Sequence, residues 1–367
     1  MDLSPAVPQP DSGVGGPMQP GVTDSGSGSL IDVQVPPGSW TNVTANLANI
    51  QSACGTLSFV SAKPDEDFLI AGIAGLGLWG SRDGGTSWQK LGMGAGSASI
   101  TNNLSSIVYD PMTPMRFWES GIYGPGLYET MDDGQTFVEL GTVSHDDLIS
   151  VDLSDPARST LLAGGHEQSQ TLYRSTDGGK TWNNVGSALP ANSQCTTPVL
   201  IDKQTYLMGC AGYGNATMGI MRSVDAAASW KLVSSMLGGS GAPLRAKDGS
   251  IYWNTLSGNG LVRSIDSGVT WMKITGEGLI MTDPVELPDG RIAALGKQYV
   301  LISADHGSSW TPASAVVPMT SGEDLHGLAY SAQRKAFYVW HNECSFNGAV
   351  PVAADAIMSF AFDYTKE

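Results

Sequence analysis

The stretch STDGGKTW, residues 175–182, decides the fold because five other stretches of the chain repeat its pattern. Aligned on the final aromatic residue, the other copies are SRDGGTSW (81–88), TMDDGQTF (130–137), SVDAAASW (223–230), SIDSGVTW (264–271) and SADHGSSW (303–310). Consecutive copies begin 39 to 49 residues apart. A period of this length accommodates one small four-stranded sheet per copy, so the chain is expected to be an array of such sheets.

The chemistry of the repeated stretch is local. Its Asp and its Ser or Thr can hydrogen-bond nearby backbone groups, its Gly can take a positive φ, and its aromatic ring can be buried. The motif resembles the Asp box of sialidase-type and related β-propellers, and the resemblance covers nearly all of the folded chain. It implies that the aspartates of the six boxes are structural rather than catalytic: Asp83, Asp132, Asp177, Asp225, Asp266 and Asp305.

Reading outward from the boxes gives the blade count. Each box is expected between the third and fourth strands of a blade, and seven first strands then follow from the pattern: GTLSFVSA (55–62), LSSIVYD (104–110), LISVDLSD (148–155), TTPVLID (196–202), APLRAKD (242–248), DPVELPD (283–289) and LHGLAYSA (325–332). The seventh blade ends at AIMSFAFDY (356–364) without a box or a fourth strand. SWTNVTA (39–45) resembles the missing strand. Residues 31–367 are therefore predicted to form an all-β, seven-bladed propeller closed by its N-terminal strand, which removes exposed sheet edges.

Composition agrees with this fold and limits the partners. The chain has 46 Gly and 20 Pro, and only 15% of its residues are charged, which suits short strands and tight turns. Residues 1–30 are rich in Pro, Gly and Ser and are expected to be a flexible linker. The net charge of −16 repels phosphates and anionic lipids, so nucleic acid and membrane surfaces are not expected as partners. No apolar stretch is long enough to span a membrane. We also expect the protein to be a monomer.

The cysteines indicate an oxidising compartment. Cys195 and Cys210 are expected to lie opposite each other in one hairpin, and Cys54 and Cys344 are expected to meet where the N-terminal strand enters the ring. Two such bridges predict an extracellular, periplasmic or cell-surface protein whose signal peptide is not part of this sequence.

Histidines and carboxylates gather in one class of loops. In propellers of this type, ligands usually occupy the face formed by the loops between strands two and three and between one blade's fourth strand and the next blade's first. Four of the five histidines map there with acidic neighbours, and carboxylates next to imidazoles suit general acid–base work. The candidate catalytic residues are His166 and Glu167 first, then His145, Asp146, Asp147, His326 and His341. They could instead be ordinary solvated loop residues.

Rings and amides near the same loops suit sugar stacking and hydrogen bonding. The candidate ligand-binding residues are Trp118, Tyr123, Tyr213, Asn215, Trp253, Asn259, Glu323, Asp324, Asn342 and Glu343. Packing between blades is the alternative for the tryptophans. No cofactor is indicated; the histidines and carboxylates could hold a divalent cation, although no local ligand spacing favours one.

Comparison with two enzyme families of similar fold argues against two activities. Sialidases hold their substrate with three arginines, and here the arginines lie beside boxes, in outer turns or along strands, so the chain is not expected to be a true sialidase. Xyloglucanase-type propellers carry a catalytic Asp where this chain has Ala74. The leading hypothesis is a secreted or surface-tethered propeller that recognises a neutral or cationic glycan and acts as a glycoside hydrolase or polysaccharide lyase. The alternative is a non-enzymatic protein-interaction scaffold or lectin-like module.

Overall fold

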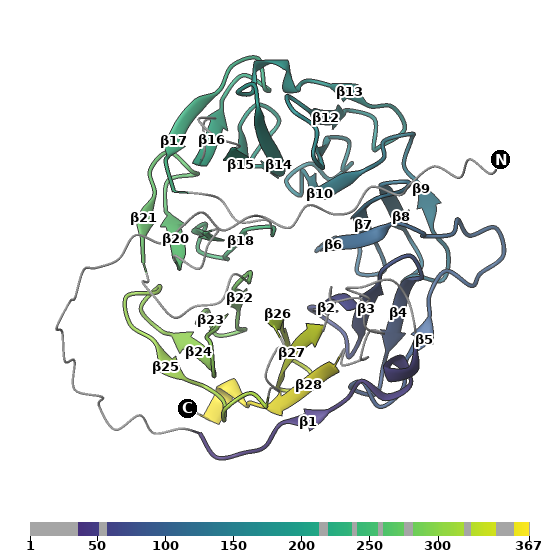
Figure 1. Cartoon of the computed structure of the whole chain (residues 1–367), viewed down its shortest axis with the longest axis vertical. Helices are drawn as coiled ribbons and strands as arrows, with labels where there is room; N and C mark the ends of the chain where they lie inside the picture. Colours follow the sequence, from purple (N-terminus) through teal and green to yellow (C-terminus); the bar gives the residue numbers. More distant parts are fainter. Residues whose placement is uncertain are drawn as a thin grey trace, which may run out of the picture. The chain divides into compact units, whose positions relative to one another are not determined.

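The computed structural model describes residues 36–50, 57–212, 219–236, 241–255, 260–274, 282–318, 324–342 and 356–366. The expected linker at 1–30 and the expected Cys54–Cys344 bridge fall outside these residues. The described strands form seven antiparallel four-stranded sheets arranged as the blades of a ring, with the first strand of each blade facing the centre (Figure 1). The predicted seven-bladed propeller is confirmed.

Six blades follow the chain order. Blades one to three contain β2 (Leu57–Ala62), β3 (Leu69–Ile73), β4 (Gly77–Ser81) and β5 (Gln89–Lys90); β6 (Asn103–Tyr109), β7 (Phe117–Ile122), β8 (Leu127–Thr130) and β9 (Val138–Glu139); and β10 (Asp146–Val151), β11 (Leu161–Gly165), β12 (Leu172–Ser175) and β13 (Asn183–Asn184). Blades four to six contain β14 (Ser193–Leu200), β15 (Tyr206–Gly212), β16 (Gly219–Ser223) and β17 (Lys231–Ser234); β18 (Leu244–Arg245), β19 (Ile251–Asn254), β20 (Leu261–Ser264) and β21 (Met272–Lys273); and β22 (Val285–Glu286), β23 (Ile292–Leu295), β24 (Val300–Ser303) and β25 (Thr311–Pro312).

The seventh blade combines the two ends of the described chain. Its sheet order is β1 (Thr41–Asn42), β28 (Ala356–Ala361), β27 (Ala336–Asn342) and β26 (Asp324–Ser331). Thr41 pairs with Ser359, and the Trp40 ring lies 5.2 Å from the Phe360 ring. The Ile357 amide also donates to the buried Thr44 hydroxyl at 2.9 Å. The N-terminal strand therefore occupies the outer position of blade seven.

The six boxes share one hydrogen-bond pattern. In the first, Ser81 donates to Asp83 Oδ1 at 2.8 Å, and the Gly85 amide donates to the Ser81 hydroxyl at 2.8 Å. The Ser87 hydroxyl donates to Asp83 Oδ2 at 2.6 Å, and these bonds lower the pKa of Asp83 to about 2. The other five boxes repeat the two side-chain bonds to Asp at 2.8 and 2.6 Å. Each of these aspartates thus stabilises the loop in which it lies.

The fourth box carries backbone strain at a position that is glycine in the other five. The second residue after each box Asp has a positive φ. This residue is Gly in five boxes, for example Gly85 at φ 91°. In the fourth box it is Ala227 at φ 76°, a region that L residues with a Cβ enter at a cost of roughly 1–2 kcal/mol. The Ala227 amide still donates to the Ser223 hydroxyl at 3.0 Å, so the box pattern survives this substitution.

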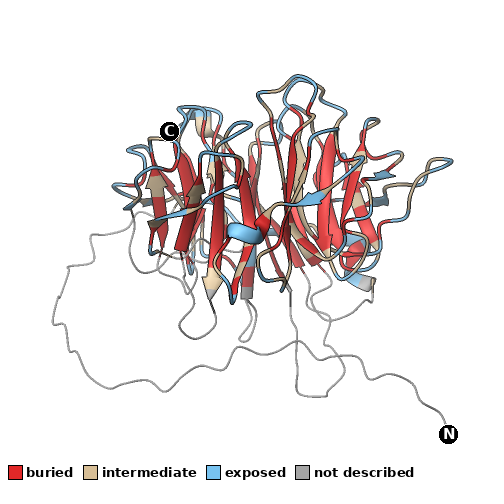
Figure 2. Cartoon of the chain, turned by 90° about the horizontal axis from the view of Figure 1, so that it is seen from above, coloured by how far each residue is buried: buried red, intermediate tan, exposed pale blue. Residues whose placement is uncertain are grey.

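Apolar packing between blades forms the core. Box aromatics reach the preceding blade: Trp88 Nε1 donates to the Val43 carbonyl at 3.1 Å, and Trp182 Nε1 donates to the Leu140 carbonyl at 3.1 Å. The strands are largely buried and the connecting loops largely exposed (Figure 2). The helical segments described are short 3-10 turns: η1 (Ala45–Asn49), η2 (Gly186–Ala188) and η4 (Tyr364–Lys366). None of these has the length needed to cross a bilayer.

The hairpin disulfide is confirmed. Cys195 and Cys210 pair in register on β14 and β15, with their Cα atoms 4.0 Å apart, and they are bonded through sulfur. The connections also define two faces of the ring. The loop face carries the connections from strand two to three and from strand four to the next blade, and the box face carries the Asp boxes and the turns between strands one and two.

Candidate functional site on the loop face

Blades two and three bring one set of predicted residues together on the loop face. Tyr123 follows β7, His145 immediately precedes β10, and His166 follows β11. Backbone bonds fix the three loops against each other, because the His166 amide donates to the His145 carbonyl at 2.8 Å and the His145 amide donates to the Gly124 carbonyl at 3.1 Å. The site is therefore assembled from three connections of two adjacent blades.

The three rings form a compact cluster. The His145 and His166 centroids lie 4.8 Å apart with their planes at 87°. The Tyr123 ring lies 5.0 Å from the His145 ring and 5.3 Å from the His166 ring. Tyr123 remains 50% exposed, so the cluster lies at the surface. We call these three residues with Asp147 and Glu167 the His145–His166 cluster.

His166 is held in one tautomer. Its Nδ1 lies 3.0 Å from Asp147 Oδ1, and because a carboxylate only accepts, Nδ1 carries the hydrogen. In the neutral ring, the Nε2 lone pair can then accept a hydrogen bond from the Tyr123 hydroxyl at 3.4 Å, and Glu167 Oε1 lies 3.9 Å from Nε2. The hydrogen bond to Asp147 is the main reason that the pKa of His166 is raised. His166 is thus arranged as a base whose charged form is stabilised.

His145 has the opposite tautomer. The Tyr123 amide donates to His145 Nδ1 at 3.1 Å, so the hydrogen of the neutral His145 ring is on Nε2. Partial burial, followed by the charge of His166, lowers the pKa of His145. The two imidazoles therefore divide their roles, with His145 neutral and His166 the first to be protonated.

Strained backbone marks the same loops. Tyr123, His145 and Glu167 all have positive φ, at 56°, 63° and 52°. Non-glycine residues seldom adopt this conformation, and such residues concentrate at functional sites. The side-chain directions that build the cluster depend on these three backbone angles.

Two buried carboxylates lie nearby and were not both anticipated. Asp146 is fully buried, neither of its oxygens has a hydrogen-bond partner among the described residues, and burial raises its pKa to about 7. Glu119 on β7 is also fully buried, and burial raises its pKa well above the usual range although Asn102 Nδ2 lies 3.4 Å from its Oε2. The predicted catalytic role of Asp146 cannot involve direct contact with a ligand in this arrangement, because its carboxylate has no surface.

The remaining candidates do not join the cluster. His326 and His341 belong to β26 and β27 of blade seven, and His341 is buried. Trp118 and Trp253 are fully buried between blades, where no ligand can stack on them. Both tryptophans therefore pack between blades, which was the alternative to ligand binding. Asp324 is the first residue of β26, and Asn342 is the last residue of β27. Five candidates fall outside the described residues: Tyr213, Asn215, Asn259, Glu323 and Glu343.

Sequence reasoning missed Glu119 and Asn102. A signal was present for Glu119, since a carboxylate in the middle of the apolar second strand FWESGI (117–122) has to be buried. Asn102 gave no comparable signal, because Asn is common in loops.

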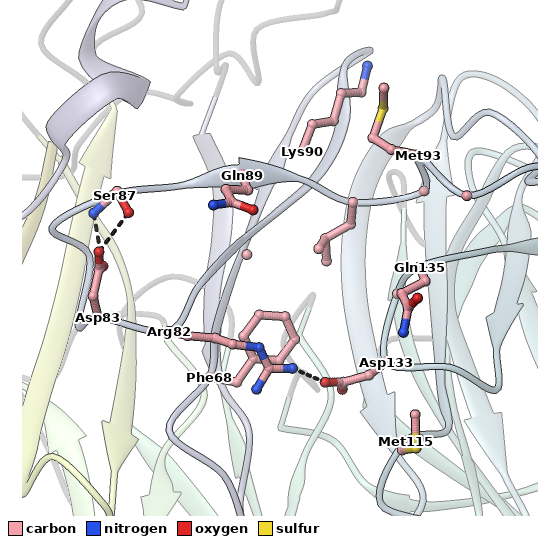
Figure 3. A pocket seen from close by; sticks show the side chains of 15 residues that line it. Phe68, Arg82, Asp83, Ser87, Gln89, Lys90, Met93, Met115, Asp133 and Gln135 are labelled. Carbon is pink, nitrogen blue, oxygen red and sulfur yellow. Dashed lines mark hydrogen bonds and ion pairs between the residues drawn. The ribbon is translucent and has the colours of Figure 1, made fainter.

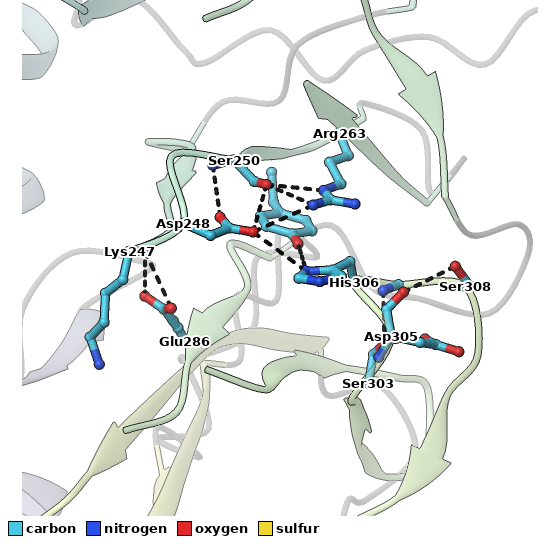
Figure 4. Close-up of polar contacts among 11 residues, drawn as sticks. Lys247, Asp248, Ser250, Arg263, Glu286, Ser303, Asp305, His306 and Ser308 are labelled. Carbon is cyan, nitrogen blue, oxygen red and sulfur yellow. Dashed lines mark hydrogen bonds and ion pairs between the residues drawn. The ribbon is translucent and has the colours of Figure 1, made fainter. Parts of the chain in front are cut away.

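Two further hollows are lined in part by residues of the Asp boxes. One, of about 720 Å³, lies between blades one and two, and Figure 3 shows Arg82 paired with Asp133 beside Phe68, with Met93 and Met115 around it. The other, of about 400 Å³, contains Asp248 and His306 (Figure 4).

Comparisons with known proteins identify the architecture. The family model for the BNR/Asp-box repeat matches residues 173–184, the third box. The chain is a seven-bladed Asp-box β-propeller. No curated protein sequence matches it.

Solved structures similar to this Asp-box propeller share its fold at low identity. YCF48, solved with a bound peptide, is 14% identical with a TM-score of 0.56, and the match covers 90% of this chain and 100% of YCF48. The Cps50 propeller domain of Myceliophteria thermophila is 13% identical with a TM-score of 0.56, covering 89% and 99% of the two chains. The extracellular domain of a protein described as a hybrid two component system from B. thetaiotaomicron is 14% identical with a TM-score of 0.56 over 83% of this chain. The Asp-box propeller spans 40% of that domain.

Proposed function

We propose that this chain recognises a neutral or cationic glycan at the His145–His166 cluster on its loop face and performs acid–base chemistry on it as a glycoside-cleaving enzyme. The observation that carries the proposal is the packing of Tyr123 against two histidines of opposite tautomer, with Asp147 and Glu167 beside them. A half-exposed ring next to carboxylates offers both a stacking surface and acceptors for sugar hydroxyls.

Charge supports the class of ligand. The cluster contains two carboxylates and no arginine or lysine, and the whole chain carries −16. Such a field attracts cations and repels polyanions. A neutral or amino-bearing sugar is therefore a better match than an acidic one.

The chemistry would be divided between two groups. His166 Nε2 can remove a proton from a hydroxyl or a water molecule, because Asp147 stabilises the resulting imidazolium. The Tyr123 phenol can donate a proton to a leaving oxygen, since partial burial and the charges of Glu167 and Asp147 raise its pKa and keep it protonated. A water oxygen then bonds to the sugar carbon as the glycosidic bond breaks.

The hairpin disulfide supports the compartment that we propose. A bond between Cys195 and Cys210 persists in oxidising surroundings, as outside the cell or in a periplasm. Extracellular glycans would be accessible there.

The test is a glycan array followed by a polysaccharide-degradation assay with the full chain. We expect His166→Ala to keep binding and to lose about 10²–10⁴-fold in turnover, the contribution of a general acid–base group. Tyr123→Ala should weaken both binding and turnover. His306→Ala, on the box face, is the matched control and should change neither. Binding that is equal in all three variants would contradict the location of the site.

A protein-interaction scaffold is the second candidate, and the hollow between blades one and two favours it. The Met93 and Met115 side chains around it are 75% and 45% exposed, and flexible thioethers adapt to varied partners. A protein partner lost with Met115→Ser and retained by Tyr123→Ala would support this function over the first.

A further inference from the structure

We propose that His145, His166 and Glu167 bind a divalent transition-metal ion of the zinc class on the loop face. The inference concerns the same cluster as the proposed glycan site, but it requires no glycan.

The three residues are grouped as ligands of one ion would be. One potential ligand atom from each lies within 4.8 Å of the other two, and no other set of three His, Cys, Asp or Glu residues in the described part of the chain meets this criterion. Two imidazoles and one carboxylate favour zinc and neighbouring transition metals over magnesium or calcium, which prefer oxygen ligands alone. Three protein ligands also leave a fourth position for water or a substrate oxygen.

His166 already has the state that a metal ligand needs. Asp147 accepts from Nδ1 at 3.0 Å, which orients the ring and leaves the Nε2 lone pair available. Carboxylate support of this kind is common behind metal-bound histidines and increases their basicity. Asp147 is therefore a positioning residue for the metal rather than a ligand.

Glu167 can close the remaining distance. Its Oε1 lies 3.9 Å from His166 Nε2, whereas two ligands of a tetrahedral zinc with bonds of about 2.0–2.1 Å lie about 3.3 Å apart. The side chain is 56% exposed, so it can turn without disturbing packed neighbours. A rotation of this side chain is enough to bring the carboxylate into range.

His145 has to exchange one hydrogen bond for the metal. Its Nδ1 now accepts from the Tyr123 amide, and the ring hydrogen is on Nε2. Coordination through Nε2 moves that hydrogen to Nδ1, so the Tyr123 amide turns to water. Because this segment is on the surface, water can replace the lost acceptor, and Tyr123 can leave its strained φ of 56°.

Metal binding and free-base catalysis exclude each other at His166. An ion on Nε2 uses the lone pair that would otherwise remove a proton. Metal occupancy would thus displace the Tyr123 hydroxyl, now 3.4 Å from Nε2, and would provide a different acid at the same place.

The experiment is isothermal titration of Zn²⁺ into the full chain after dialysis against a chelator, with no glycan present. We expect one ion per chain and at least 100-fold weaker binding in His166→Ala and in Glu167→Gln. Asp147→Asn should weaken binding by about 10–100-fold, as outer carboxylates do. His306→Ala removes a histidine that is more exposed than His166 and lies in an Asp box, away from the cluster, and this variant should bind Zn²⁺ as the wild type does.

Glu167→Gln keeps the test valid if His166→Ala fails to fold, because Glu167 is exposed and its replacement has the same size. Equal Zn²⁺ affinity in the wild type and in folded Glu167→Gln would overturn the proposal, as would a fall in affinity in His306→Ala alone. Failure to bind zinc leaves the glycan assay unaffected, so the two proposals fail separately.

Discussion

Deleting residues 1–50 is expected to lower the free energy of unfolding by about 5 kcal/mol or more, because the deletion removes the outer strand of blade seven. Trp40 would no longer cover Phe360, and its Nε1 would no longer donate to the Ala315 carbonyl at 2.9 Å. The Ile357 amide would lose the Thr44 hydroxyl, and a buried unpaired amide alone costs about 1–3 kcal/mol. Leu47, which is buried against blade one, would also be lost.

Urea unfolding followed by tryptophan fluorescence measures this effect. The matched control is deletion of residues 1–35, which keeps Trp40 to Ile50; we expect it to unfold at nearly the wild-type urea concentration. A 1–50 deletion as stable as this control would mean that β1 adds nothing to blade seven. Exposed backbone on β28 should also make the shorter protein aggregate more readily.

In the wild type, we expect the free energy of unfolding to fall as pH rises because of Glu119. The variant Glu119→Gln is expected to lack this loss. Glu119 keeps its proton in the folded state, because burial raises its pKa well above the usual range, whereas the unfolded chain releases it near its ordinary pKa. As pH rises above that ordinary value, the unfolded state binds fewer protons than the folded state, so stability falls by up to about 1.4 kcal/mol per pH unit. Glutamine has no such proton, and the variant should be the more stable protein at pH 8.

Unfolding curves at several pH values between 4 and 8 test this prediction. The difference between Glu119→Gln and the wild type should grow with pH. Glu139→Gln, at an exposed position of the same blade, is the control and should follow the wild type throughout. Parallel curves for wild type and Glu119→Gln would show that Glu119 ionises alike in both states.

The sequence was sufficient for the blade count because the box is a local device. Each copy contains its own hydrogen-bond partners, so Ser175, Asp177 and Thr181 interact as their spacing predicts. The alternation of connections also placed His145 and His166 on one face. Their meeting follows from the adjacency of blades two and three.

Side-chain burial could not be predicted in the same way. Trp118 and Trp253 end up between blades because the neighbouring sheets pack over them, which depends on contacts between distant residues. His326 and His341 were expected in the same class of loops as His166, but they lie on strands β26 and β27 in a different part of the ring. The tautomers of His145 and His166 could not be predicted from the sequence, because they were assigned from the hydrogen bonds with the Tyr123 amide and the Asp147 carboxylate.

The central claim is that His166 presents its unprotonated Nε2 on the loop face, because Asp147 holds the ring hydrogen on Nδ1, beside a His145 of the opposite tautomer. Two-bond ¹H–¹⁵N correlation spectra of the metal-free protein at pH 8 report the protonated nitrogen of each histidine directly. The predicted result is a hydrogen on Nδ1 of His166 and on Nε2 of His145. A hydrogen on Nε2 of His166 would contradict both the base and the metal site.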